Sequence, residues 1–255
     1  MALRALARVN LAAIERNVVA LRGRLDGGTE LCAVVKADAS GHGALPVARA
    51  ALAAGATMLA VATAGEAAEL RAARLTAPIL IMGAVSSEEL PVALGAGAEL
   101  VAWNAQFVQQ LAAAGGPGSV NVHIKLDSGM GRLGTRDTDE AFAVAEYVHR
   151  AAPGLRLAGA MTHLATADGD LAFAAGQLDV FAPFAAELQR RYGRLRVHAA
   201  NSAATLRVPG SHFDMVRCGI ALYGCDPMNE DPDSTGLEQA MELSSYVAAV
   251  KRAEP

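Results

Sequence analysis

Residues 31–43 have the sequence Leu-Cys-Ala-Val-Val-Lys-Ala-Asp-Ala-Ser-Gly-His-Gly. The stretch opens with an uninterrupted apolar run, Leu31 to Val35, reaches a lysine at position 36, and continues into a loop that contains Gly41 and Gly43. An apolar run of this length, bounded by turn residues, is typical of a parallel strand that is buried on both faces. Because the same pattern recurs along the chain, this segment guides the interpretation of the rest.

Similar apolar runs follow at intervals that leave room for a helix between them. Each is nearly continuous in apolar character rather than alternating, as in parallel strands covered on both faces. The predicted strands are Cys32–Lys36, Leu59–Thr63, Ile79–Gly83, Leu100–Trp103, Val120–Asp127, Leu157–His163, Arg196–Asn201 and Met215–Leu222.

Alanine-rich segments of helical period separate these runs. A further helix precedes the first strand, and Asn10 is suited to cap it. The predicted helices are Asn10–Leu25, Ala44–Ala54, Ala64–Ala73, Asn104–Ala113, Thr138–Ala151 and Leu171–Tyr192. Strands and helices in this alternation predict an α/β fold, a (β/α)8 TIM barrel. A doubly wound open sheet is the alternative, but no GxGxxG motif follows the first strand.

The composition of the 255-residue chain excludes several classes of partner. The net charge is −4 and no basic run stands out, which argues against nucleic acid and anionic membrane as partners. No span of about 18 uninterrupted apolar residues is present, and the N-terminus does not resemble a signal peptide. The cysteines at 32, 218 and 225 form no CxxC and no metal-like cluster. This usage fits a reducing compartment, and we expect a cytoplasmic protein without a metal.

The region after Gly224 differs from the rest. Residues 225–236 are polar and rich in turn formers, and residues 240–250 have the character of one more strand. A lone strand is not stable by itself, so it either pairs elsewhere in the chain or opens a second domain. We therefore predict a barrel over residues 1–224, and over residues 225–255 a linker with the first strand of a truncated β-domain.

Lys36 is the first candidate for chemistry. An ammonium at the end of an apolar run is costly to desolvate, so its pKa can fall and its neutral amine can act as a nucleophile. A lysine amine joined to an aldehyde is a Schiff base, the usual attachment of pyridoxal phosphate. The alternative is a lysine that ends a strand and points to solvent.

Further polar residues follow the other predicted strands, where the active site of a barrel lies. Each has a structural alternative: Asp127 as a helix cap, His163 as a core histidine, Arg217 as a member of a buried ion pair. Asn201 and Ser202 open a short helix after the seventh strand, and Gly219 follows the eighth. Loops at those two positions often bind phosphate in barrels. The polar residues at the strand ends are Lys36, Lys125, Asp127, Arg132, His163, His198, Asn201, Ser202 and Arg217.

These residues resemble those of the alanine racemases, from Val9 to the end of the chain. Five ordered motifs carry the resemblance, and together they are far more specific than any one of them. They are Val34-Val35-Lys36-Ala37-Asp38-Ala39 with Gly41-His42-Gly43, Lys125 to Gly134, Met161-Thr162-His163-Leu164-Ala165 with Asp168, His198 to Ala203, and Arg217 with Gly219 to Gly224.

The resemblance implies a barrel, a second β-rich domain, pyridoxal 5'-phosphate as cofactor and alanine as substrate. Lys36 would hold the cofactor as an aldimine and act as a base on one face of the substrate. His163 would lie against the pyridine ring, and Arg217 would donate to its nitrogen. The resemblance also implies that Ser202, Gly219 and Ile220 hold the phosphate and that Asn201 binds the cofactor. Arg132 would lie near the cofactor oxygen, steadied by Lys125, which in many relatives carries a carbamate. His198 would form a hydrogen bond with Arg217.

Two departures from the family pattern bear on function. The family usually has a tyrosine that contacts the phosphate where this chain has Ser40, so weaker cofactor binding is expected. The chain also stops before most of the β-domain, which in the family supplies a tyrosine to the partner's site in a homodimer. Racemisation needs proton transfer on both faces of the substrate, and Lys36 serves one.

Three hypotheses follow. The first is an alanine racemase-type isomerase of D-alanine biosynthesis, inactive or weakly active as this chain alone. The second is a pyridoxal-phosphate-binding carrier without turnover, and the third is a non-functional fragment. Related barrels act on serine, lysine, arginine or ornithine, so the choice of alanine rests on resemblance.

Overall fold

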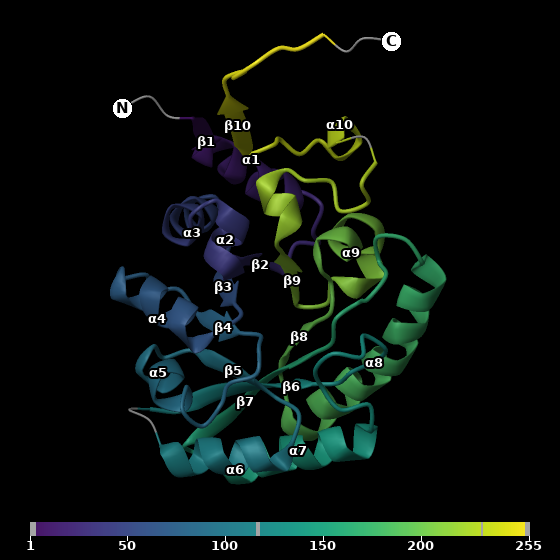
Figure 1. The fold of residues 1–255 in the computed structure, drawn as a ribbon. Helices are drawn as coiled ribbons and strands as arrows, with labels where there is room; N and C mark the ends of the chain where they lie inside the picture. The colour runs from purple at the N-terminus through teal and green to yellow at the C-terminus, as the bar shows by residue number, and fades with distance from the viewer. Residues whose placement is uncertain (1–3, 116–117, 231, 253–255) are drawn as a thin grey trace.

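A barrel of eight parallel strands forms the body of the protein in the computed structural model, which describes residues 4–115, 118–230 and 232–252 (Figure 1). The strand order is β9-β2-β3-β4-β5-β6-β7-β8, so each strand pairs with its neighbour in the chain except at the seam. The predicted (β/α)8 class is confirmed, and the doubly wound alternative is wrong. The strands are β2 (Glu30–Val34), β3 (Met58–Val61), β4 (Ile79–Ile81), β5 (Glu99–Ala102), β6 (Val120–Lys125), β7 (Leu155–Met161), β8 (Arg196–His198) and β9 (Met215–Cys218).

Hydrogen bonds between β8, β9 and the residues that flank them close the seam. The backbone N–H of Asp214 donates to the carbonyl of Val197 at 3.0 Å, and that of Arg217 donates to Ala200 at 3.0 Å. The carboxylate of Asp214 accepts from the N–H of Val197 at 2.8 Å. These bonds bring the two strand ends that carry Arg217 and His198 together.

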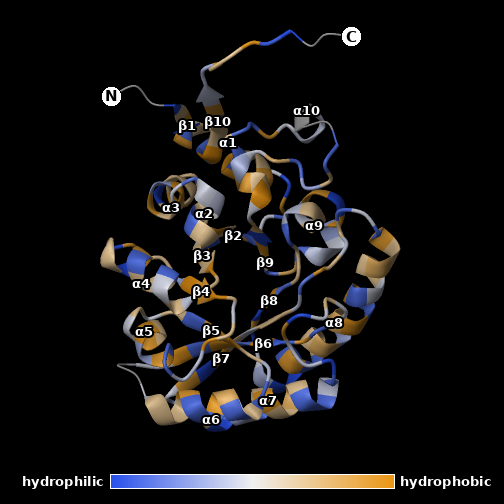
Figure 2. Ribbon diagram, viewed as in Figure 1, coloured by the Kyte–Doolittle hydropathy of each residue, from blue (hydrophilic) through white to orange (hydrophobic). Residues whose placement is uncertain are grey.

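Helices cover the outside of the barrel and show alternating hydrophobic and hydrophilic residues along their length (Figure 2). Such a pattern lets one face pack on the strands while the other faces water. The side chain of Asn10 accepts from the N–H of Ala13 at 3.2 Å, so the predicted cap is confirmed. The helices are α1 (Leu11–Arg22), α3 (Ala44–Ala53), α4 (Ala64–Ala72), α5 (Leu90–Gly95), α6 (Ala105–Ala114), α7 (Thr138–Arg150), α8 (Leu171–Tyr192), α9 (Ser202–Arg207) and α10 (Pro232–Thr235), with short 3-10 turns η1 (Pro209–Ser211) and η2 (Ile220–Tyr223).

Helix α8 is long and apolar enough to cross a membrane by length and composition. In the barrel it buries one stripe that includes Phe181, Phe184 and Leu188. Its last turns carry an ion-paired cluster of Glu187 with Arg190 and Arg191. Packing on the barrel accounts for part of its apolar character, whereas Leu171, Phe173 and Val180 stay exposed.

The predicted strands extend too far at their carboxyl ends. Strand β2 ends at Val34 rather than Lys36, β7 at Met161 rather than His163, and β9 at Cys218 rather than Leu222. After β7 the chain leaves the sheet where polar residues begin, at Thr162, whereas after β2 and β9 it leaves within apolar sequence, at Val35 and Gly219. Lys36 and His163 therefore stand on turns beyond the strand ends, whereas Lys125, His198 and Arg217 lie on strands.

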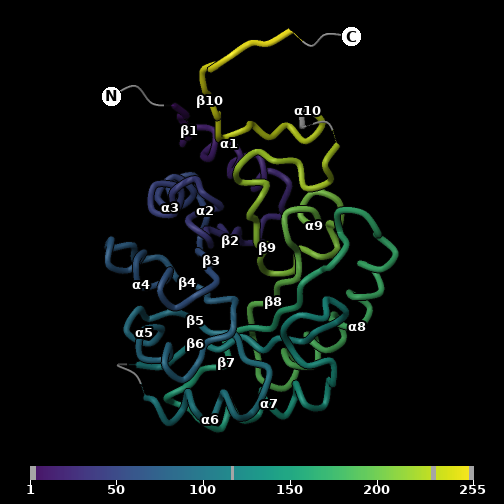
Figure 3. Tube along the Cα trace, viewed as in Figure 1, coloured from purple at the N-terminus to yellow at the C-terminus, as the bar shows by residue number. Residues whose placement is uncertain are grey.

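The strand predicted near residue 240 forms as β10 (Met241–Ser245) and pairs antiparallel with β1 (Ala5–Val9), which the sequence did not predict. The two lie side by side at one end of the molecule, outside the barrel (Figure 3). Residues 246–250 continue without regular structure and are exposed. Of the two alternatives for this strand, pairing within the chain is what the structure shows.

Asn17 ties the C-terminal segment to the barrel. Its side chain is buried, donates to the carbonyls of Leu222 at 3.0 Å and Glu238 at 2.7 Å, and accepts from the N–H of Glu238 at 2.7 Å. The side chain of the neighbouring Arg16 makes an exposed ion pair with Glu238 at 2.7 Å.

Asn17→Leu is expected to lower the free energy of unfolding by roughly 2–4 kcal/mol, because it strands buried backbone groups. Arg16→Ala, the matched control, should cost less than about 1 kcal/mol because exposed ion pairs contribute little. Urea denaturation of both variants measures the difference. Equal destabilisation would mean that the buried amide does not anchor the segment.

Candidate active site

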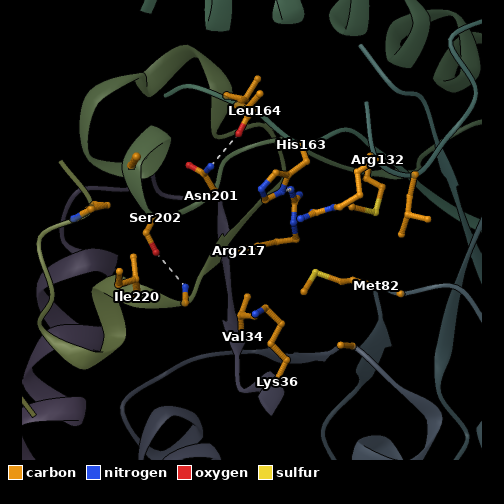
Figure 4. A pocket seen from close by; sticks show the side chains of 18 of the residues that line it. Val34, Lys36, Met82, Arg132, His163, Leu164, Asn201, Ser202, Arg217 and Ile220 are labelled. Atoms are coloured by element: carbon orange, nitrogen blue, oxygen red, sulfur yellow. Dashed lines mark hydrogen bonds between the residues drawn. The ribbon is translucent and has the colours of Figure 1, made fainter. Parts of the chain in front are cut away.

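A cavity of about 590 Å³ lies at the carboxyl ends of the barrel strands. It collects residues from loops that are distant in sequence (Figure 4). Of the residues predicted for the site, His198 and Asp127 do not line it. Those on its wall are Lys36, Lys125, Arg132, His163, Asp168, Asn201, Ser202, Arg217, Gly219 and Ile220.

The turn that follows Lys36 has an unusual backbone. Ala37, Asp38, Ala39 and Ser40 all have φ between 51° and 54°, within the segment α2 (Lys36–Gly41), so the turn is left-handed. Left-handed geometry costs L-residues roughly 1–2 kcal/mol each. Such strain persists only where surrounding contacts hold it.

Two carboxylates hold this turn. Glu66 Oε1 accepts from the N–H of Ala37 at 2.6 Å, and Asp38 Oδ1 accepts from the N–H of Ala44 at 2.7 Å. Glu66 also closes a capping box with Thr63 at the start of α4, so one side chain joins that helix to the lysine turn. The Thr63-x-x-Glu66 pattern signals a helix start in the sequence, but its link to position 37 appears only in the fold.

Lys36 itself is exposed at the cavity. The expectation that the apolar run buries its amine is wrong, because the strand ends two residues earlier and the turn carries the side chain into the open mouth. Figure 4 shows the side chain beside Val34, across the cavity from Arg132 and His163.

Arg217 is buried at the floor of the cavity, with 3% exposure. Its guanidinium donates to the carbonyls of Thr162 at 2.8 Å and Ala199 at 2.9 Å, and to Nδ1 of His198 at 2.8 Å. Among the described residues no carboxylate pairs with it, so the ion-pair alternative is wrong. Burial lowers the pKa of Arg217 to about 10, which leaves it protonated at neutral pH.

Positive charges converge on His163. Burial, followed by the charges of Arg217, Arg132 and Lys125, lowers the pKa of His163 to about 3. Its imidazole is therefore a neutral ring on the cavity wall. A neutral ring is able to stack on an aromatic ligand without the cost of burying a charge.

Lys125 lies on the cavity wall and is only 3% exposed. Burial, then the charges of Arg217 and Arg132, lowers the pKa of Lys125 from 10.5 to about 8. A fraction of this amine is thus neutral near physiological pH. As an ammonium it repels the guanidinium of Arg132.

The loop that carries Arg132 is shaped by Asp127. The carboxylate of Asp127 accepts from the N–H groups of Gly129 and Gly131 at 3.0–3.1 Å and from Arg136 at 3.3 Å. It therefore organises a glycine loop and does not cap a helix. Arg132 is exposed at the rim as a result.

Ser202 and Asn201 join the loops after β8 and β9. Ser202 Oγ accepts from the N–H groups of Gly219 at 3.0 Å and Ala221 at 3.2 Å. Asn201 accepts from the N–H of Ala204 at 3.0 Å and donates to the carbonyl of Leu164 at 3.0 Å, so both ends of its amide hold the loops in place. Asp170 rather than Asp168 caps α8, which leaves Asp168 at the rim.

Comparison with known proteins matches this site to one family. Residues 9–227 match the family described as alanine racemase, N-terminal domain. The chain belongs to the alanine racemase family. It is 40% identical over 251 residues to the alanine racemase of Desulforamulus reducens, covering 96% of this chain and 68% of that relative. Alanine racemase 1 of Bacillus subtilis is 38% identical, with 96% of this chain and 63% of the relative covered.

Solved structures of alanine racemases share the barrel. The enzyme of Streptomyces coelicolor A3(2) superposes with a TM-score of 0.91 at 38% identity, covering 97% of this chain and 68% of that one. The Bacillus anthracis enzyme with bound L-Ala-P gives 0.86 at 37% identity, covering 95% and 64%. The chain thus spans about two thirds of the length of these alanine racemases.

The lowered pKa of Lys125 predicts a pH-dependent stability. Below pH 8 the amine is charged in both states, whereas between pH 8 and 10.5 the unfolded chain retains a proton that the folded chain has lost. Stability should therefore rise with pH in that window, by up to about 3 kcal/mol.

Urea denaturation at several pH values, in buffer freed of carbon dioxide, tests this. Lys125→Met should lack the rise, and Lys251→Met, at an exposed position, should keep it. A rise of the same size in Lys125→Met would assign it to another group.

Proposed function

We propose that this chain forms the cofactor-binding barrel of an alanine racemase, an isomerase that interconverts L- and D-alanine with pyridoxal 5'-phosphate. The observation that carries the proposal is the convergence of an exposed lysine amine, a neutral imidazole and a buried guanidinium on one cavity. The barrel over residues 1–224 and a linker with the first β-domain strand over residues 225–255 are the corresponding domains. We also infer a homodimer in the cytoplasm.

The donor set of the cavity fits the cofactor. A volume of about 590 Å³ lies within the usual range for small-molecule sites. Ser202 and Ile220 stand at one side with a hydroxyl and a backbone N–H for a phosphate, Gly219 joins them through its bond to Ser202, and Asn201 holds their loop in shape. Arg217 lies at the floor and would donate from its guanidinium to a ring nitrogen. Lys36 provides the amine for covalent attachment.

When bound, pyridoxal phosphate supplies a conjugated ring that withdraws electrons from the α-carbon of an amino acid. Lys36 then moves a proton on one face of that carbon. Arg217 keeps its own proton and donates a hydrogen bond, so a ring nitrogen facing it stays largely unprotonated. His163 would support the ring with its neutral imidazole, and Arg132 would meet an oxygen at the rim.

Proton return on the opposite face needs a second group. Within the described part of the chain, the cavity wall offers no tyrosine hydroxyl for this step. We therefore assign it to a partner subunit, in keeping with the dimer proposed above. The neutral fraction of Lys125 would react with carbon dioxide to give a carbamate, whose negative charge would steady Arg132.

Lys36→Ala should abolish the near-visible absorbance of the bound cofactor, because the chain has only three lysines and Lys36 is the one exposed at the cavity. Borohydride reduction followed by peptide mass analysis locates the attachment. Lys251→Ala is the matched control and should retain the band and the labelled peptide. Unchanged absorbance in Lys36→Ala would show that another group holds the cofactor.

Exchange of the α-proton of L- and D-alanine in deuterated water then separates a racemase from a carrier. A racemase half-site should exchange at least one enantiomer through Lys36. Exchange of neither enantiomer by a cofactor-loaded, well-folded sample would favour the non-catalytic carrier.

Ser40→Tyr is expected to tighten cofactor binding, because a phenol at this position would extend toward the phosphate where the serine hydroxyl is too short. One added hydrogen bond to a charged group predicts a roughly tenfold lower dissociation constant. Ser40→Phe, which lacks the hydroxyl, is the control and should bind like the parent. Equal affinities for the parent and Ser40→Tyr, measured by fluorescence titration, would contradict this role.

A further inference from the structure

A line of buried polar side chains runs from Arg217 through the interior of the barrel. Nδ1 of His198 lies 2.8 Å from Arg217, Nε2 of His198 lies 2.9 Å from Nδ1 of His123, and Nε2 of His123 lies 2.7 Å from Glu99 Oε2. Both histidines are fully buried and Glu99 is 7% exposed. The line therefore leads from the cavity floor to an acid at the far end of the strands.

Only one arrangement of protons satisfies this line. Arg217 has donors and no acceptor, so His198 must accept through an unprotonated Nδ1. His198 then carries its proton on Nε2 and donates to Nδ1 of His123. His123 in turn carries its proton on Nε2 and donates to the carboxylate of Glu99. Every hydrogen bond points away from the cavity, and the last acceptor carries the negative charge.

We propose that Glu99, His123 and His198 form a positioning relay that holds the guanidinium of Arg217 from behind. The relay holds Nδ1 of His198 as an acceptor opposite Arg217, and it places the compensating carboxylate of Glu99 at the opposite end of the barrel. A carboxylate in direct contact with Arg217 would compete with a ring nitrogen for the same donors and repel an anionic ligand. On the cavity side Arg217 then meets Nδ1 of His163 at 3.4 Å, and no carboxylate of the described residues pairs with it there.

Neighbouring residues make room for the relay and contact its carboxylate. A Cβ at Gly159 would lie 2.3 Å from Nδ1 of His123, so the absence of a side chain in β7 makes room for this ring. The second oxygen of Glu99 accepts from Asn121 at 2.9 Å, and Arg196 lies 3.7 Å from the first.

Protonation energetics agree with the hydrogen-bond geometry. Burial and the charge of Arg217 hold the pKa of His198 well below its usual value. Burial, the largest single influence, would raise the pKa of Glu99, but His123, Asn121 and Arg196 together outweigh it and lower the pKa. A neutral His198 and an ionised Glu99 are the states that the proton arrangement requires.

Nitrogen NMR of protein labelled with 15N-histidine tests the relay directly. In the parent chain, His123 and His198 should both be neutral, with the proton on Nε2. A proton on Nδ1 of His198, or on both of its nitrogens at neutral pH, would overturn the proposal. This measurement needs no cofactor, so it stands or falls apart from the proposed function.

Glu99→Leu removes the last acceptor, and His198, two residues along the relay, should then show a mixture of tautomers. Glu99→Gln retains an acceptor oxygen and should restore the parent tautomers. Glu30→Leu is the matched control, because Glu30 contacts the same Arg196 at 3.4 Å but not the relay. A His198 spectrum of Glu99→Leu that matches that of Glu30→Leu would overturn the proposal.

The effect on the cofactor rests on the proposed function. Glu99→Leu should weaken pyridoxal phosphate binding about three- to tenfold, as expected for a loosened hydrogen bond, and shift the absorbance maximum of the complex. Glu99→Gln should remain near the parent in both affinity and absorbance.

Parent-like affinity and absorbance in Glu99→Leu, together with altered tautomers, would show that the relay does not hold Arg217. Failure of the parent to bind the cofactor would instead refute the proposed function. The tautomers of the parent decide the relay even where Glu99→Leu does not fold.

Discussion

Burial of a guanidinium inside a closed sheet is the constraint on which the site depends. Arg217 enters the barrel from β9 and is surrounded by strands whose backbone groups are committed to the ladder. Its charge is met by two carbonyls and an imidazole rather than by a carboxylate. Because a buried charge without partners costs several kcal/mol, these groups cannot move independently. The polarity of the interior around β6, β8 and β9 follows from that requirement.

The electrostatic character of the cavity follows from the same charge. Arg217 contributes to the low pKa values of both His163 and Lys125, which keep the first ring neutral and part of the amine uncharged. Neither shift needs a negative group in the cavity. Among the described lining residues an anionic ligand thus meets several cations and one carboxylate, Asp168 at the rim, while the balancing carboxylate of Glu99 stays remote.

Sequence alone predicted the barrel and the residues that gather at its mouth, because parallel strands buried on both faces leave long apolar runs and polar residues mark their ends. It overextended the strands at those ends, since composition does not show where Lys36 leaves the ladder. It missed β1, whose partner lies more than 230 residues away. It also missed His123 and Glu99, because a polar residue within a strand acquires meaning only when the barrel closes and brings β5, β6 and β8 into line. The roles of the site residues remain predictions.

The left-handed turn after Lys36 makes the lysine motif inseparable from its scaffold. Four consecutive non-glycine residues in this conformation would relax in an isolated peptide, where nothing offsets their strain. The handedness is imposed from outside the segment, by Glu66 on the next βα unit and by the start of α3. A graft of the lysine and its flanking residues onto another barrel would transfer the sequence of the motif but not the turn that orients the lysine amine. The portable unit is two consecutive βα units rather than ten residues.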